Sequence, residues 1–126
     1  ERVLGMAPAS PRVSDRGKML AAVRRDGRAL EQGLEELRRD REVVMAAICS
    51  DGRALEFAAE ELRGDRELVL AALESDGLAL QFASAELRAD RLVVLAATRQ
   101  DGRALQFAHS SVRLDPELLR ASVQPR

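Results

Sequence analysis

Hydrophobic and polar positions along this chain repeat with a period of 25 residues. Each period holds an Asp-Gly pair, then Ala-Leu after one further residue, then Leu-Arg, or Val-Arg in the last copy. The Asp-Gly pairs start at Asp26, Asp51, Asp76 and Asp101. A second series consists of Asp15, Asp40, Asp65, Asp90 and Asp115. Repetition at a period of this size is typical of arrays in which one small structural unit is stacked on the next.

The first half of each period predicts a short buried helix. Asp40 is suited to cap a helix start, and Glu42 complements the positive end of the helix. Residues 43–49 are then apolar almost without interruption. A helix that is apolar on most sides has to be covered on several of them, so we expect this helix, Cys49 included, to lie inside the array.

The second half of each period predicts an amphipathic helix. Asp51-Gly52 ends the first helix, since glycine readily adopts the left-handed conformation found after helix ends. An Asp-Gly pair also suits a β-hairpin. Apolar residues spaced by three and four positions between Ala54 and Leu62 favour a second α-helix instead.

These elements predict an all-α fold, an α-solenoid of about four stacked helix–turn–helix hairpins plus a terminal helix. We expect a single repeat domain over residues 14–124 and an extended N-terminal arm over residues 1–13. The terminal helix, 116–123, leaves Leu118, Leu119 and Val123 to be covered, either by the fourth hairpin or by a neighbouring chain.

The combined pattern, including Phe57, Phe82 and Phe107, resembles a helical repeat family catalogued only as a domain of unknown function. This family is abundant in dinoflagellate and haptophyte algae and in some bacterial effector-like proteins. The resemblance implies a helical array and no established chemistry. Family members often have Asn before the turn glycine and Tyr in the aromatic position, and Gln32 and Gly33 depart furthest from the pattern.

Composition argues against several classes of function. The net charge is −1 and aromatic residues make up 2% of the chain, which argues against general affinity for nucleic acid and against base stacking. No apolar run is long enough to cross a bilayer. We expect an intracellular protein, cytoplasmic or organellar, with import into a plastid after removal of a targeting segment as one version.

Candidate catalytic residues are few. His109 is the single histidine and Cys49 the single cysteine, and we interpret them as a helix-face residue and a structural thiol. The periodic aspartates are spaced as helix caps and not as a calcium-binding loop. We therefore expect no enzymatic activity, no metal or other cofactor, and no small-molecule substrate.

Arginine is also periodic. One column follows the second aspartate series, one follows the Asp-Gly turns, and one ends the second helices. Ladders of guanidinium groups can bind phosphates or carboxylates. Because acidic and basic residues nearly balance, we interpret these columns as surface ion pairs. The first column contains Arg16, Arg41, Arg66 and Arg91.

Departures from the repeat are the best candidates for a partner-binding site, because the shared positions are needed for the fold. Glu56, Glu60 and Glu61 belong to the acidic part of a face that becomes neutral along the array. Leu92 and Leu114 replace polar or small residues on one edge, and Leu78 replaces an arginine on the opposite edge.

Three functions remain as hypotheses. The first is a non-catalytic scaffold or accessory subunit that contacts other proteins in a larger assembly, for example an algal organellar complex such as a photosynthetic one. The second is an adaptor that binds peptides or partners reversibly. The third is a nucleic-acid-binding module that uses the arginine columns.

Overall fold

A computed structural model describes residues 15–123 of the chain. The arm expected for residues 1–13 lies outside this range. The helices, with η marking a 3₁₀ helix, are α1 (Arg16–Arg25), η1 (Gly27–Gln32), α2 (Glu35–Arg38), α3 (Arg41–Ser50), η2 (Gly52–Phe57), α4 (Glu60–Arg63), α5 (Arg66–Ser75), η3 (Gly77–Phe82), α6 (Ala85–Arg88), α7 (Arg91–Gln100), η4 (Gly102–Phe107), α8 (Ser110–Arg113) and α9 (Pro116–Val123). No β-strand occurs between residues 15 and 123.

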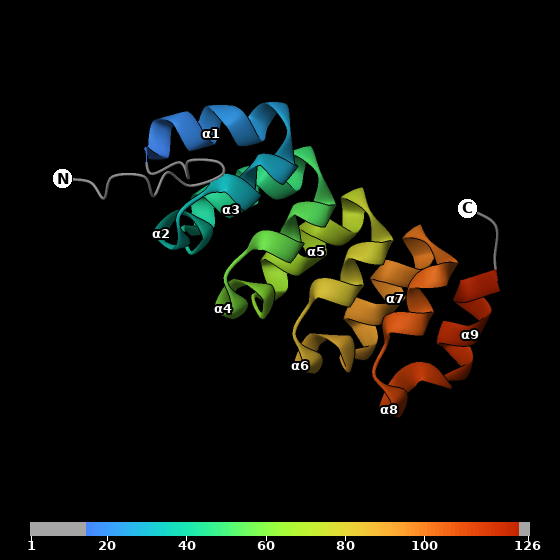
Figure 1. Cartoon of the computed structure of the whole chain (residues 1–126). Coiled ribbons are helices and arrows are strands. Elements are labelled where there is room, and N and C mark those ends of the chain that lie inside the picture. Colours follow the sequence, from blue (N-terminus) through green and yellow to red (C-terminus); the bar gives the residue numbers. More distant parts are fainter. Residues whose placement is uncertain (1–14, 124–126) are drawn as a thin grey trace, which may run out of the picture.

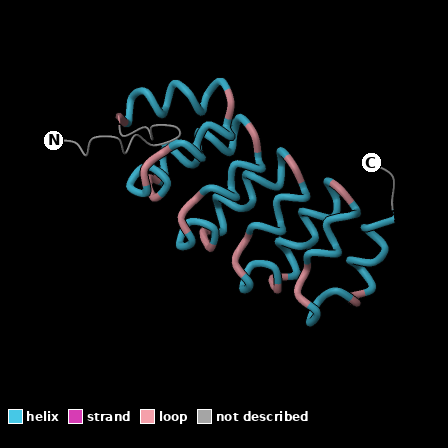
Figure 2. Tube along the Cα trace, in the orientation of Figure 1, coloured by secondary structure: helices cyan, strands magenta, loops and turns pink. Residues whose placement is uncertain are grey.

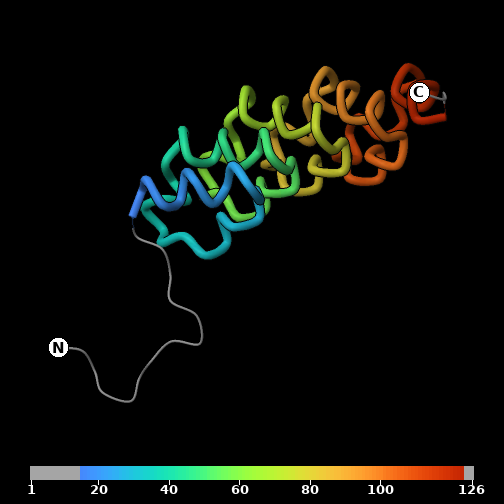
Figure 3. Tube along the Cα trace, turned by 90° about the horizontal axis from the view of Figure 1, so that it is seen from above, coloured from blue at the N-terminus to red at the C-terminus, as the bar shows by residue number. Residues whose placement is uncertain are grey.

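The units stack side by side into an elongated array, with α1 at one end and α9 at the other (Figure 1; Figure 3). The long helices α1, α3, α5, α7 and α9 pack in sequence, and each 3₁₀ helix packs between the long helices before and after it. The predicted all-α solenoid with a terminal helix is therefore confirmed.

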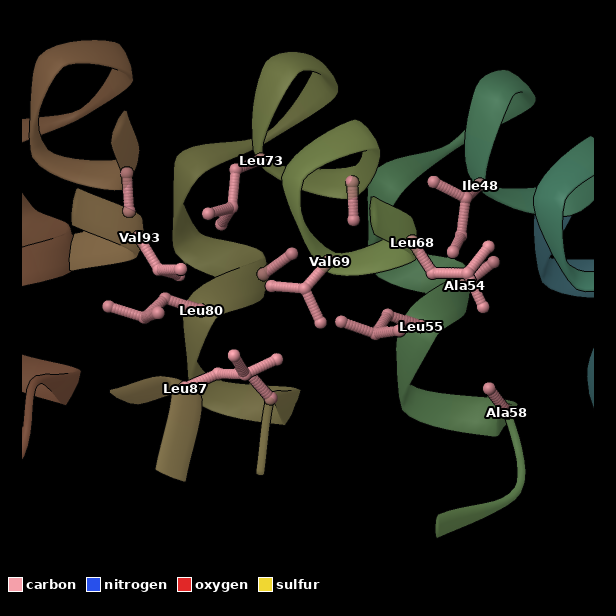
Figure 4. Close-up of a cluster of buried hydrophobic side chains, with 14 of the residues drawn as sticks. Ile48, Ala54, Leu55, Ala58, Leu68, Val69, Leu73, Leu80, Leu87 and Val93 are labelled. Atoms are coloured by element: carbon pink, nitrogen blue, oxygen red, sulfur yellow. The ribbon is translucent and has the colours of Figure 1, made fainter. Parts of the chain in front are cut away.

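Each interior long helix begins at an aspartate cap and buries the residues that face the neighbouring units. In α5, the Asp65 carboxylate accepts hydrogen bonds from the Glu67 and Leu68 amides at 3.0 and 3.2 Å. Leu68, Val69, Ala72 and Leu73 are buried. Figure 4 shows such side chains from successive units in one apolar layer, which is continuous along the array.

The long helices are less enclosed than their composition predicted. In α3, Met45 and Ala46 are only half-buried and Cys49 is exposed. The neighbouring units cover two sides of the helix, and the third side stays at the surface. An apolar run of this length therefore overstates how much of the helix is enclosed.

The second half of each unit differs from the predicted α-helix. A 3₁₀ helix such as η2 is followed by two extended residues, Ala58 and Ala59, and then by the single turn α4. Figure 2 shows this interruption as a loop between the two helical pieces. The Ala59 amide donates to the Arg38 carbonyl of the preceding unit at 2.9 Å. The Ala59 amide thus donates to a carbonyl of the preceding unit and not to a carbonyl one helical turn earlier in its own unit.

The Asp-Gly glycines serve a close approach between units and not a left-handed turn. None of these glycines has a φ in the left-handed region. A Cβ on Gly77 would lie 2.6 Å from the Ala97 carbonyl oxygen of the next long helix, and the equivalent positions are at least as close. The preceding aspartate caps the 3₁₀ helix, as in the 2.9 Å bond from the Leu78 amide to Asp76.

Candidate partner-binding surfaces

The three predicted acidic residues border one groove, although they do not lie on one helix. Glu56 is on η2, while Glu60 and Glu61 are in the first turn of α4. The groove lies between α2 and α4 and has a volume of about 600 Å³. Arg38, Arg39 and Arg63 line it as well. We call it the Glu56 groove.

Charges of both signs meet in the Glu56 groove. Arg39 pairs with Glu61 of the next unit at 3.3 Å and with Glu35 of its own unit at 3.6 Å. No ion pair within the described residues involves Glu56 or Glu60. The groove thus presents two carboxylates without an ion pair, Glu56 and Glu60, beside two paired ones, Glu35 and Glu61.

The arginines that end the short helices are not part of an ion-pair ladder. The Nε atoms of Arg38, Arg63 and Arg88 are buried and have no hydrogen-bond partner. Their backbone carbonyls are used instead, since each accepts an amide from the following unit at 2.8–3.0 Å. These arginines therefore join neighbouring units through their backbone carbonyls. The periodic arginine side chains gave no indication of this role in the sequence.

The column Arg16, Arg41, Arg66 and Arg91 forms what we call the arginine ladder. Each guanidinium pairs with the cap aspartate of the next unit, as Arg41 does with Asp65 at 2.9 Å. Arg41 also reaches Glu67 at 2.5 Å. The Arg16 guanidinium holds the pKa of Asp40 below its usual value, and Arg41 does the same to the pKa of Asp65. The predicted surface ion pairs are confirmed for this column.

Leu92 interrupts the arginine ladder. It stands in the first turn of α7, where Glu42, Glu67 and Glu117 stand in three of the other units. Arg66 consequently pairs with Asp90 alone, at 2.9 Å. The Leu92 side chain is 58% exposed. An apolar side chain thus lies exposed in a row of charges, next to an arginine with one carboxylate fewer than its neighbours.

The other two predicted leucines differ in exposure. Leu114 follows α8 and is 77% exposed, whereas Leu78 on η3 is half-buried against the core. Leu92 and Leu114 both lie along the edge of the array at which the long helices begin, Leu92 at the start of α7 and Leu114 just before α9. Leu78 therefore offers much less free surface than the other two.

A second groove lies at the end of the array. It has a volume of about 370 Å³ and is lined by Leu105, Leu114 and Leu119 together with residues of η4, α8 and α9. We call it the C-terminal groove. Leu118 packs into the core, but Leu119 is 42% and Val123 79% exposed. The fourth hairpin therefore covers only part of the apolar surface of α9.

His109 has a structural role at the start of a short helix. His109 is exposed and caps α8, with its Nδ1 accepting the Ser111 amide at 3.0 Å. The sequence held a signal for this role, because Ser84, a common cap residue, fills the same position in the previous unit and caps α6. Among the described residues, no three His, Cys, Asp or Glu side chains are placed to hold a metal ion. No helix in that part of the chain meets the length and hydropathy needed to span a membrane.

The fold and these surfaces define a helical-repeat protein. The chain belongs to the family described as Domain of unknown function (DUF4116), whose model matches residues 15–63 and 65–121. The two matched segments lie in tandem and together cover most of the array. No curated protein and no solved structure matches the chain significantly.

Proposed function

We propose that this protein is a non-catalytic helical-repeat scaffold or accessory subunit that contacts other proteins in a larger assembly. One observation carries the proposal. The large apolar side chains that are exposed in the described residues all occur from position 92 onward: Leu92, Leu114, Leu119 and Val123. Apolar surface concentrated in one region is typical of protein–protein contact sites.

The physical reason is the cost of leaving this surface in water. Leu92 and Leu114 replace residues that the repeat keeps polar or small, so neither is needed to build a unit. Covering an apolar side chain contributes about 25 cal/mol per Å² of buried apolar area. A partner that covers this edge therefore gains from residues that contribute little to the fold.

An accessory subunit of an algal organellar complex, such as a photosynthetic one, is the concrete version of this proposal. It rests on the resemblance to algal repeat proteins and not on a residue of the site.

A reversible adaptor is the second candidate, and the Glu56 groove favours it. The groove offers the unpaired carboxylates Glu56 and Glu60, and the apolar residues Leu34 and Ala58 also line it. A basic peptide would suit this surface. The nucleic-acid alternative has less support, because the arginine ladder is already occupied by carboxylates of the neighbouring units.

Co-purification from the native source, followed by mass spectrometry, tests the proposal. The tagged chain is compared with Leu92→Ser/Leu114→Ser, with Glu56→Lys/Glu60→Lys/Glu61→Lys, and with the control Arg24→Ser at an exposed position on α1. We expect loss of the partner only from the leucine variant. Loss only from the lysine variant would replace the scaffold by the adaptor, and unchanged co-purification in all variants would contradict both.

A further inference from the structure

Arg66 leaves open two hydrogen-bond donors that the other members of the arginine ladder use. In Arg41, the Nε atom donates to the cap aspartate of the next unit, and Nη2 donates to the glutamate two residues later. Arg16 and Arg91 use the same two atoms for the same two partners. Arg66 instead holds its aspartate through Nη1, at 2.9 Å. No hydrogen bond among the described residues uses its Nε or Nη2.

The open side of the Arg66 guanidinium has the geometry to bind one carboxylate through two bonds. Its Nε and Nη2 lie side by side in one plane and match the two oxygens of a carboxylate. Leu92 takes the place of the glutamate that fills this site in the other units. The glutamates of the neighbouring units, Glu67 and Glu117, already pair with arginines of their own. This edge of the array therefore has no carboxylate left over for Arg66.

Leu92 is also the first residue of an apolar surface that continues along α7. Residues three, four and seven positions later lie on the same side of a helix, and these are Leu95, Ala96 and Arg99. Leu92 is exposed, Ala96 is half-buried and Leu95 is nearly buried. We call this side of α7, together with Arg66, the Leu92 surface. Its middle is apolar, and a basic residue stands at each end.

The charge of the Leu92 surface differs from that of the same side of α5. There, Glu67 and Glu74 stand at the first and last of these positions. The helix α7 has Leu92 and Arg99 at those positions and contains no acidic residue. Arg99 is exposed, and no ion pair among the described residues involves it. A side that is acidic in one unit is thus apolar and basic in the next.

A depression of about 180 Å³ gives an incoming side chain room beside Arg99. It lies between α7 and α9, and its charged residues are Arg99, Glu117 and Arg120. The Glu117 carboxylate is held by Arg91. The two arginines of the depression have no ion pair among the described residues, so a carboxylate suits this end of the surface as well as the Arg66 end.

We propose that the Leu92 surface binds a segment of a partner protein in which apolar residues lie between two acidic residues. This inference rests on the proposed function and names the chemistry of the partner. One acidic side chain pairs with the open side of Arg66, the other pairs with Arg99, and the apolar residues cover Leu92 and Ala96. The surface extends about 10 Å along α7, which corresponds to two turns of a partner helix or about three residues of extended chain.

The test starts from a random peptide library displayed on phage and the whole chain immobilised as bait. Peptides of about 12 residues are long enough to place two acids 10 Å apart in either conformation. The same selection is run in parallel on Leu92→Glu, whose carboxylate occupies the open side of Arg66. We expect the wild-type chain to enrich sequences with acidic residues on both sides of an apolar pair, and Leu92→Glu not to enrich them.

The enriched peptide is then synthesised with a fluorescein label, and fluorescence anisotropy gives its Kd for each variant. We expect a wild-type Kd below about 1 mM. Leu92→Gln loses the apolar contact and weakens binding about fivefold. Leu92→Glu also competes for Arg66 and repels the peptide, so it weakens binding at least about threefold further. Circular dichroism checks that each variant keeps the helix content of the wild type.

The arginine contacts are tested separately. Arg66→Gln and Arg99→Gln are each expected to weaken binding about threefold, and the wild-type Kd to weaken in high salt. Replacing the matching peptide acid by its amide should abolish the effect of Arg66→Gln, because the two changes remove the same pair. Arg41→Gln and Arg24→Gln are the matched controls, since the repeat places them at the positions of Arg66 and Arg99. Both are expected to keep the wild-type Kd.

Other results overturn the inference in distinct ways. Enrichment of basic peptides assigns binding to the Glu56 groove, and no enrichment on the wild-type chain removes the site. Equal Kd values for Leu92→Gln and Leu92→Glu remove the carboxylate from the contact. A dimer that light scattering detects for the wild type and not for Leu92→Glu makes a second copy the occupant. In all these cases the proposed function stands if the native partner is still lost from Leu92→Ser/Leu114→Ser.

Discussion

The long helices α5 and α9 have nearly the same apolar pattern and very different surroundings. In α5, Val69 and Leu73 are buried between two units. In α9, Leu119 and Val123 hold the same positions and are 42% and 79% exposed. Burial in this array is therefore a property of the neighbours and not of the helix, as expected for a fold in which each unit contacts only the adjacent ones.

The largest effect we predict is on an interior leucine. Leu80 on η3 is fully buried, so Leu80→Ala leaves a cavity between units and is expected to cost about 2–5 kcal/mol of unfolding free energy. Leu119→Ala, at the partly exposed end, is expected to cost about 1 kcal/mol or less. Urea denaturation followed by circular dichroism measures both. Equal losses would show that α9 is covered as fully as η3.

The next effect concerns the close approach between units. Gly77→Ala places a Cβ 2.6 Å from the Ala97 carbonyl oxygen, so the two units must move apart. We expect a loss of about 1–3 kcal/mol, the usual cost of overpacking. Gly64→Ala is the matched control, because its Cβ would have its nearest neighbour at 3.6 Å and its φ is −98°.

For Gly64→Ala we expect a gain of about 0.4–1 kcal/mol, since alanine restricts the unfolded chain more than glycine does. Denaturation midpoints of the two variants are measured side by side. If Gly77→Ala were as stable as Gly64→Ala, the Asp-Gly glycine would have no role in stacking the units.

A smaller effect is expected where the arginine ladder is interrupted. Leu92→Glu gives Arg66 the second carboxylate that Arg16, Arg41 and Arg91 already have. Because the site is exposed, the gain is expected to be at most about 1 kcal/mol, and to shrink in high salt. Leu92→Gln is the uncharged control, and a thermal melt at two salt concentrations separates the variants.

The same substitution sharpens the functional proposal. If Leu92 is kept for a partner, Leu92→Glu stabilises the chain and weakens co-purification of that partner. A variant that gained stability and kept its partner would show that Leu92 is not needed for partner binding.

The repeat could be predicted from sequence because its caps, turns and apolar positions recur at one period. The structure of the second half of each repeat unit could not be predicted in the same way. Ala54, Leu55, Ala58 and Leu62 fit an α-helix by spacing, but the bond from the Ala59 amide to the Arg38 carbonyl of another unit extends the chain there. A contact between units has no local signal in the sequence.

The candidate binding residues, too, could be predicted only in part from the sequence. Departures from the repeat identified Leu92 and Leu114, because a residue that the fold does not require stands out against the other copies. Leu78 stood out equally, yet it is half-buried against the core. Whether a departure is exposed depends on its place in the stack, and periodicity alone does not give that place.

The smallest predicted effect is the pH dependence of stability that comes from Asp40 and Asp65, the caps of α3 and α5. Hydrogen bonds from Arg16 and Arg41 hold the pKa values of Asp40 and Asp65 below the usual value for aspartate. A carboxyl with a lower pKa in the folded state binds fewer protons there than in the unfolded state. Its contribution to stability is therefore present above the unfolded pKa, near 4, and is lost as the pH falls through the folded value.

We expect the urea midpoint to be flat at neutral pH and to fall below about pH 4. Arg41→Gln removes the partner of Asp65, so the variant loses a little stability at pH 7 and the two curves converge at pH 2. Arg24→Gln, an exposed arginine on α1 for which the described residues show no ion pair, should follow the wild-type curve throughout. A constant offset between Arg41→Gln and wild type down to pH 2 would mean that Arg41 stabilises the stack through packing of its side chain and not through the Asp65 carboxylate.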